Sequence, residues 1–127
     1  MADNNLISLV PRPLTRERFA PYGDVIETFP GAASAMNDAR FERFDDLCDV
    51  DLSGGEVRIS VSRCRTPSAL PLRVDKVERH ALGSQAFVPL SRSAMVIVVA
   101  PPGEDVWAED LRAFVTNGRQ GFNYHRG

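Results

Sequence analysis

Hydrophobic and polar residues alternate along much of the second half of the chain, which predicts a protein built mainly of β-strands. In "EVRISVSRC", residues 56–64, Val57, Ile59 and Val61 alternate with arginine and serine, the two-residue period of a half-buried strand. The run "SAMVIVVA" is apolar throughout and predicts a buried strand that ends before Pro101. Further strand-like segments lie at residues 24–29, 73–82, 84–90 and 111–116.

The evidence for helices is limited to the N-terminal region. "TRERFA" predicts one or two helical turns, with Thr15 as the N-cap, before Pro21 ends the helix. Residues 30–38 predict a loop, and residues 39–51 are compatible either with a helix or with a strand and a turn. Many short strands separated by turns every ten or so residues indicate a β-barrel or a β-sandwich.

The length and composition indicate one globular domain spanning residues 1–127. Apolar residues make up 43% and charged residues 25%, as in ordinary soluble proteins. The formal charge of −2 gives no electrostatic reason to expect nucleic acid or an anionic membrane as a partner. No apolar stretch reaches the ~20 residues of a membrane helix, and the acidic start predicts no signal peptide. Cys48 and Cys64 form no CxxC pair, so we expect structural thiols in a reduced, cytoplasmic setting.

Three side chains that can move a proton or bind a metal lie within eight positions of one another. Strand alternation places Glu78 and His80 on one face, and Gln85 follows a turn at Leu82-Gly83. In an antiparallel hairpin all three could converge inside a barrel. A glutamate beside a histidine suits general acid–base chemistry, because each group can hold the other's proton or charge. The same pattern also fits a metal site or a solvated polar strand edge, and these alternatives stay open.

The number of histidines restricts a metal site. His80 and His125 are the only histidines in the chain, so a site with three histidines is excluded. A site with two histidines and one carboxylate would need both, together with Glu78 or another acid.

Two further features are candidates for binding. Arg63 shares the apolar register of residues 56–64, so it either reaches solvent at the strand end or binds an anion inside. The segment "NGRQGFNYHRG" holds polar side chains among glycines, as binding loops at barrel mouths and plain polar turns both do. Its candidate residues are Asn117, Gln120, Asn123, Tyr124, His125 and Arg126.

Five segments together resemble the ureidoglycolate lyases, formerly called ureidoglycolate hydrolases. They are "LTRERFAPYGDVIE", "RFDDL", "RCRTPSALPL", "ERHALGSQAFVPL" and "LRAFVTNGRQGFNYHRG", and they extend from Leu14 to Gly127. The resemblance implies a cupin fold, a double-stranded β-helix barrel that assembles as a homodimer. It also implies cleavage of (S)-ureidoglycolate to glyoxylate and urea, a step of allantoin and purine degradation.

The cupin comparison gives Glu78, His80 and Gln85 a second interpretation. A typical first cupin motif has His-x-His, a four-residue gap and then Glu. Here the same positions hold Glu78, His80 and Gln85, which weakens metal coordination and favours an acid–base role. Chains of the family continue past "NYHRG" into a Trp-His-His stretch and further strands. We therefore expect a shortened chain, whose barrel lacks one side and one further histidine.

Ureidoglycolate implies a role for each candidate residue. Breaking its C–N bond needs a base for the hydroxyl proton, an acid for the leaving nitrogen and a cation for the carboxylate. The base is Glu78 or His80, and His125 is an acid, or a ligand with Glu78 and His80 if a divalent metal binds. The expected substrate-binding residues are Arg63 or Arg126 for the carboxylate and Gln85, Asn123 and Tyr124 for the ureido group.

The sequence itself requires no cofactor, although a divalent metal ion is compatible with it. Two other functions are compatible with the residues. One is a metal-dependent cupin enzyme of different chemistry, and the other is a non-catalytic cupin fragment that binds a small molecule.

Overall fold

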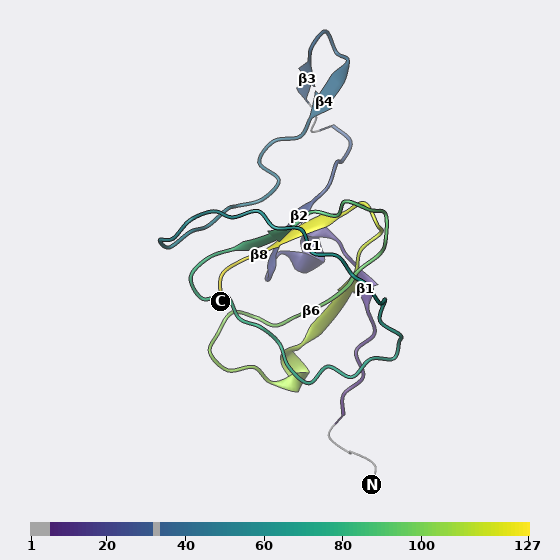
Figure 1. The fold of residues 1–127 in the computed structure, drawn as a ribbon, viewed down its shortest axis with the longest axis vertical. Coiled ribbons are helices and arrows are strands. Elements are labelled where there is room, and N and C mark those ends of the chain that lie inside the picture. The colour runs from purple at the N-terminus through teal and green to yellow at the C-terminus, as the bar shows by residue number, and fades with distance from the viewer. Residues whose placement is uncertain (1–5, 32–33) are drawn as a thin grey trace.

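The strands of the described residues form two three-stranded sheets and one separate hairpin (Figure 1). The structure is a computed structural model that describes residues 6–31 and 34–127. The first sheet has the order β1 (Arg12–Pro13), β7 (Arg112–Val115) and β6 (Val96–Val99). The second has the order β2 (Gly23–Ile26), β8 (Gly121–Tyr124) and β5 (Gln85–Phe87). The hairpin consists of β3 (Ser34–Met36) and β4 (Phe41–Arg43). The prediction of a mainly β fold is confirmed, but the sheets do not close into a barrel.

Aromatic and aliphatic side chains from both sheets form the core. The helix α1 (Arg16–Phe19) inserts the fully buried Phe19, whose ring lies 5.5 Å from Phe114 and 6.3 Å from Tyr124, measured between centroids. The Oγ1 atom of Thr15 accepts a hydrogen bond from the Arg18 amide at 3.2 Å, so the predicted cap is confirmed. The buried core residues are Leu14, Phe19, Val25, Ile97, Val99, Phe114 and Phe122.

Alternation along β8 separates an apolar face from a polar face. Phe122 and Tyr124 join the core, whereas Asn123 points to the opposite face. On that face Asp24 in β2 lies directly across from Asn123. The second sheet therefore packs on the core with one side and carries polar groups on the other.

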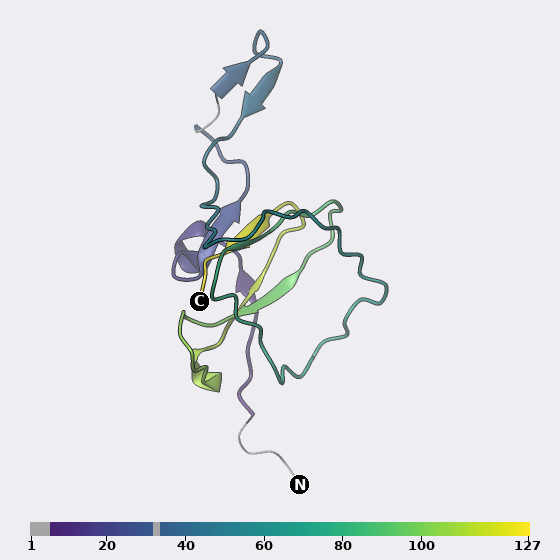
Figure 2. The ribbon, with the colours of Figure 1, turned by 60° about the vertical axis from the view of Figure 1, so that its left-hand side comes forward.

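The β3–β4 hairpin extends away from the body in both ribbon views (Figures 1 and 2). Its turn has positive φ at Asn37, Asp38 and Ala39. The loop predicted over residues 30–38 is thus wrong where β3 forms. For residues 39–51, the structure selects a strand and a turn over a helix.

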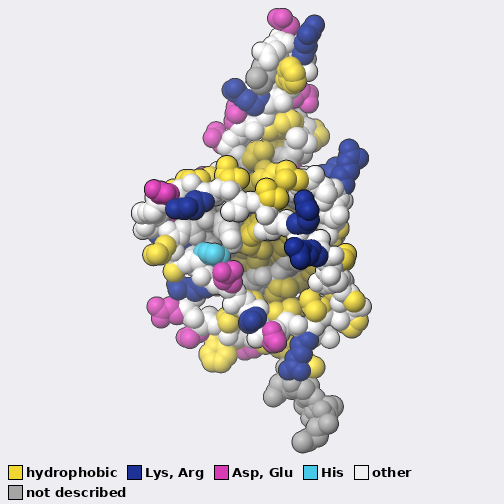
Figure 3. Space-filling model, viewed as in Figure 1, with side chains coloured by type: hydrophobic (Ala, Val, Ile, Leu, Met, Phe, Trp, Pro, Cys, Tyr) yellow, Lys and Arg dark blue, Asp and Glu magenta, His cyan; other side chains and the backbone are white. Residues whose placement is uncertain are grey.

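The strands predicted at residues 56–64 and 73–82 are wrong, because neither segment belongs to a sheet of the structure. A strand needs a hydrogen-bonded neighbour, and within the described residues neither segment pairs with one. Ile59 is 95% exposed and Val61 is 76% exposed. Residues 56–64 lie away from the two sheets in Figure 2. On the face of the molecule shown in Figure 3, apolar side chains line a hollow.

Residues 93–100 are only partly the buried strand that their composition predicts. Ile97 and Val99 are buried in β6, whereas Val96 is 43% exposed. Only alternate side chains of β6 are buried, so the run behaves as a half-buried strand. A short 3-10 helix, η1 (Ala108–Asp110), precedes β7. Among the described residues, no helix has the length and apolar composition needed to cross a membrane.

Candidate functional site

One carboxylate oxygen organises the polar face of the second sheet. The Oδ2 atom of Asp24 accepts hydrogen bonds from the Asp49 amide at 2.9 Å, from Asn123 Nδ2 at 3.0 Å and from His125 Nε2 at 3.1 Å. The acceptor and its donors come from three parts of the chain, at Asp24, Asp49 and residues 123–125, and the pairing of β2 with β8 over four residues brings the first and the last of these together. Asp24 thereby joins two residues that the sequence singles out, Asn123 and His125.

The environment of Asp24 favours the ionised carboxylate. Partial burial raises the pKa of Asp24, but the hydrogen bonds from Asp49, Asn123 and His125 outweigh burial, and the pKa lies below its ordinary value. Asp24 is therefore negatively charged at neutral pH. Three directed donors stabilise this charge, and the side chain remains 25% exposed.

Asn123 is fully buried and forms part of the hydrogen-bond network around Asp24. Besides its bond to Asp24, its Nδ2 donates to the Asp49 carbonyl at 2.9 Å. Its Oδ1 atom is buried and makes no hydrogen bond within residues 6–31 and 34–127. Asn123 thus fixes the loop at Asp49 against the end of β8.

A second carboxylate holds the residue after His125. Asp51 binds Arg126 through both oxygens, with Nε–Oδ2 and Nη2–Oδ1 distances of 2.5 Å. The hydrogen bond from Arg126 lowers the pKa of Asp51, and the Asp51 carboxylate raises the pKa of Arg126. The guanidinium predicted to hold a substrate carboxylate therefore already binds one here.

The backbone of Asp51 also anchors the segment that contains Glu78 and His80. Its amide donates to Ser84 Oγ at 2.8 Å, and the Ser84 amide donates to the Asp51 carbonyl at 2.9 Å. A Cβ atom on Gly83 would lie 2.8 Å from that carbonyl oxygen, so this close approach requires glycine. The Gly127 amide donates to the His80 carbonyl at 2.8 Å, which brings the two candidate segments side by side.

Glu78 and His80 lie near each other, as the sequence predicts. Their Oε2 and Nε2 atoms are 3.5 Å apart, within ion-pair distance. The geometry is not that of a hydrogen bond, because within the described chain the buried His80 Nε2 has no hydrogen-bond partner. Gln85 lies opposite Tyr124 in the β5–β8 ladder, so both point to the core side of the sheet.

Tyr124 and Arg63 lie in contrasting surroundings. Burial raises the pKa of Tyr124 to about 12, and its ring lies 5.7 Å from that of Phe87, measured between centroids. Arg63 is exposed on the unpaired segment 56–64. Of the two alternatives for Arg63, the structure shows the solvent-exposed one.

The candidate metal ligands do not come together. His125 pairs with Asp24, whereas His80 lies beside Glu78. Across residues 6–31 and 34–127, no group of three or more histidine, cysteine, aspartate or glutamate side chains could hold a metal ion. These residues therefore do not fit a metal centre in this arrangement.

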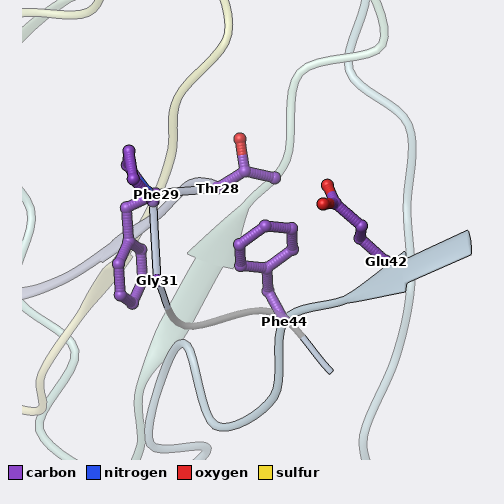
Figure 4. A pocket seen from close by; sticks show the side chains of 6 residues that line it. Thr28, Phe29, Gly31, Glu42 and Phe44 are labelled. Carbon is purple, nitrogen blue, oxygen red and sulfur yellow. The ribbon is translucent and has the colours of Figure 1, made fainter. Parts of the chain in front are cut away.

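Two open pockets lie on the described surface. The first, of about 330 Å³, lies at the base of the β3–β4 hairpin (Figure 4). It is lined by Thr28, Phe29, Pro30, Gly31, Glu42 and Phe44. The second, of about 220 Å³, is lined by Arg16, Ala20, Gly23, Asp24, Val25, Asp46, Leu47 and His125. Of the residues that the sequence singles out as candidates, His125 alone lines either of these two pockets.

The chain is similar to known proteins along almost its whole length. The profile of the family described as ureidoglycolate lyase matches residues 6–127. A ureidoglycolate lyase from Pseudomonas syringae pv. syringae (strain B728a) is 48% identical over 120 residues, which cover 94% of this chain and 71% of the relative. One from Pseudomonas fluorescens (strain Pf0-1) is 47% identical over 121 residues, which cover 94% and 72%. The chain belongs to the ureidoglycolate lyase family.

Membership of the ureidoglycolate lyase family confirms the resemblance seen in the sequence. It does not test the roles of the individual residues, which stay predictions. Sequence reasoning missed Asp24 and Asp51, the two acids that hold His125 and Arg126. Asp24 and His125 are separated by 101 positions, and no local pattern joins them.

Proposed function

We propose that this chain catalyses the reaction for which its family is named, the cleavage of (S)-ureidoglycolate to glyoxylate and urea. The observation that carries the proposal is the 48% identity to a curated ureidoglycolate lyase over 94% of the chain. The matched region includes every candidate residue, from Arg63 to Arg126. The enzyme is then a carbon–nitrogen lyase of allantoin and purine degradation.

The substrate needs a base, an acid and a site for its carboxylate. Its central carbon bears a hydroxyl, a carboxylate and a urea nitrogen. A base takes the hydroxyl proton, the oxygen forms the carbonyl of glyoxylate, and the C–N bonding electrons leave with the nitrogen. That nitrogen accepts one proton and departs as urea, so the atoms and charges balance without an oxidant or water.

Within this proposal, the base is Glu78 or His80. Their 3.5 Å separation supports a shared proton-transfer role, since each can respond to the charge of the other. His125, exposed on the second pocket, is the acid. No step is assigned to a metal ion.

Three of the proposed substrate-binding residues, Asn123, Tyr124 and Arg126, lie in or just after β8. Gln85 and Tyr124, on one face of the sheet, orient the ureido group, and Asn123, fully buried on the opposite face, contributes from within the network that fixes this end of β8. Arg63 or Arg126 holds the carboxylate. For Arg126 this requires that the substrate share or replace the contact with Asp51.

Glyoxylate release by the purified chain tests the proposal. Release from (S)-ureidoglycolate is expected well above the spontaneous decay of the substrate. Glu78→Gln is expected to lower turnover at least ~10²-fold if Glu78 transfers the proton. Lys76→Gln changes one charge on the same segment and serves as the matched control. A folded wild-type chain that releases glyoxylate only at the spontaneous rate would refute the proposed function.

We also propose that the enzyme is a cytoplasmic homodimer that binds neither nucleic acid nor membrane. The formal charge of −2 supports the absence of polyanionic partners. Sedimentation equilibrium measures the assembly directly, and a monomer at micromolar concentration would contradict the dimer.

A further inference from the structure

We infer that Asp24 is a positioning residue that holds His125 through Nε2, so that Nδ1 is the nitrogen that transfers the proton to substrate. The inference rests on the proposed function for its catalytic meaning and on the Asp24 contacts for its geometry. It assigns a role to an acid that the sequence did not single out.

The hydrogen bond between the two side chains fixes which nitrogen carries the proton. Asp24 is ionised, and an ionised carboxylate can only accept hydrogen bonds. The His125 Nε2 atom, 3.1 Å from Asp24 Oδ2, must therefore be the donor. In the neutral ring Nδ1 is then the unprotonated nitrogen, and in the charged ring Nδ1 carries the proton that can leave.

Asp24 is itself held rigidly enough to orient another side chain. Its Oδ2 atom receives the Asp49 amide and the buried Asn123 amide in addition to His125. The His125 backbone is also fixed, because its amide donates to the Tyr22 carbonyl at 3.0 Å. Hydrogen bonds at the backbone amide and at Nε2 together restrict the rotation of the His125 ring. A carboxylate that accepts a hydrogen bond from a functional histidine usually orients the ring in this way.

The His125 ring is partly exposed. The His125 side chain is 40% exposed and lines the 220 Å³ pocket. Within the described residues, its Nδ1 makes no hydrogen bond. Arg16 and Asp46 are the other charged side chains around this pocket besides Asp24. A small polar substrate in this pocket can therefore reach the His125 ring, and no described protein group competes for Nδ1.

Asp24→Asn is the sharpest kinetic test, because it keeps the shape and offers an amide that can donate to Nε2. We expect kcat to fall about 10- to 100-fold and KM to change less than about threefold. Asp49→Asn is the matched control, since Asp49 enters the network through its backbone alone. It removes the same charge and is expected to keep kcat within about twofold.

The nitrogen-15 NMR spectrum of the imidazole rings gives a readout that does not depend on turnover. With only two histidines, His80→Gln identifies the His125 signals. Wild-type His125 is expected in the single form protonated at Nε2 when neutral, and as a mixture of both forms after Asp24→Asn. A mixture in the wild-type protein would overturn the inference even if the variant failed to fold.

The two measurements separate this inference from the proposed function. A wild-type chain without lyase activity would refute the function, and the ring spectrum would still decide whether Asp24 sets the form of His125. An active wild type whose Asp24→Asn and Asp49→Asn variants had equal kcat would overturn the positioning role.

Discussion

Replacing Asn123 with aspartate tests the buried network around Asp24 directly. The Asn123 amide is fully buried and donates to Asp24 Oδ2 at 3.0 Å and to the Asp49 carbonyl at 2.9 Å. The substitution Asn123→Asp keeps the size and shape of the side chain. It removes both donated hydrogen bonds and places a second carboxylate beside Asp24.

The expected loss follows from these contacts. A hydrogen bond to a charged acceptor contributes about 1.5–3 kcal/mol and one to a carbonyl about 0.5–1.5 kcal/mol. Two carboxylates ~3 Å apart at an effective dielectric constant of about 20 repel each other by roughly 5 kcal/mol. The carboxylate introduced at position 123 relieves part of this repulsion when it binds a proton. We expect the free energy of unfolding to fall by about 4 kcal/mol or more near neutral pH, close to the whole stability of a marginal domain.

Urea unfolding of the wild type, Asn123→Asp and Asn123→Ala measures this loss. Asn123→Ala removes the same donors without adding a charge, so it separates the hydrogen-bond effect from the repulsion. The aspartate variant is expected to be the less stable one near pH 7. The difference should shrink toward about pH 4.5, because the new carboxyl group becomes protonated there. A loss below about 1 kcal/mol for Asn123→Asp would refute the buried network.

Two further predictions concern the core. Burial raises the pKa of Tyr124 from 10.0 to about 12, so its contribution to stability is complete below pH 10 and is lost as pH rises through 12. Phenolate absorbance, with the other tyrosine replaced by phenylalanine, should show a midpoint clearly above 10, and a midpoint near 10 would contradict burial. Ile59 is 95% exposed and Ile97 is 4% exposed. Ile97→Ala should cost about 2–5 kcal/mol and Ile59→Ala less than about 0.5 kcal/mol; equal losses in urea unfolding would mean that residues 56–64 are packed in solution.

Local signals were sufficient for the elements that depend on local chemistry. Thr15 caps α1 because its hydroxyl reaches the Arg18 amide three residues later. The strand-like segment predicted at residues 111–116 yields β7, in which Ala113 and Phe114 are buried. The β3 strand was not predicted, because Ser34 and Ala35 have little intrinsic preference for strands. They form a strand because they pair with β4.

In the candidate site too, contacts between near neighbours in the sequence were predicted and contacts between distant residues were not. The closeness of Glu78 and His80 follows from their spacing of two residues, and the structure retains it. The contacts of Asp24 with His125 and of Asp51 with Arg126 join positions 101 and 75 residues apart. These groups come together only because β2 pairs with β8 and because the loop through Asp51 passes beside them. Neither feature can be predicted from a short stretch of the sequence.

A two-residue period identifies a segment that can have two different faces, but it does not supply the neighbours that make those faces different. The β8 strand is paired on both edges, with β2 and β5. Its alternation therefore places Phe122 in the core and Asn123 in the polar network. Residues 56–64 alternate more regularly, yet no described strand pairs with either edge, and Ile59 remains exposed. Hydrogen-bonded edges, rather than alternation alone, decide which side chains of this chain can build a site.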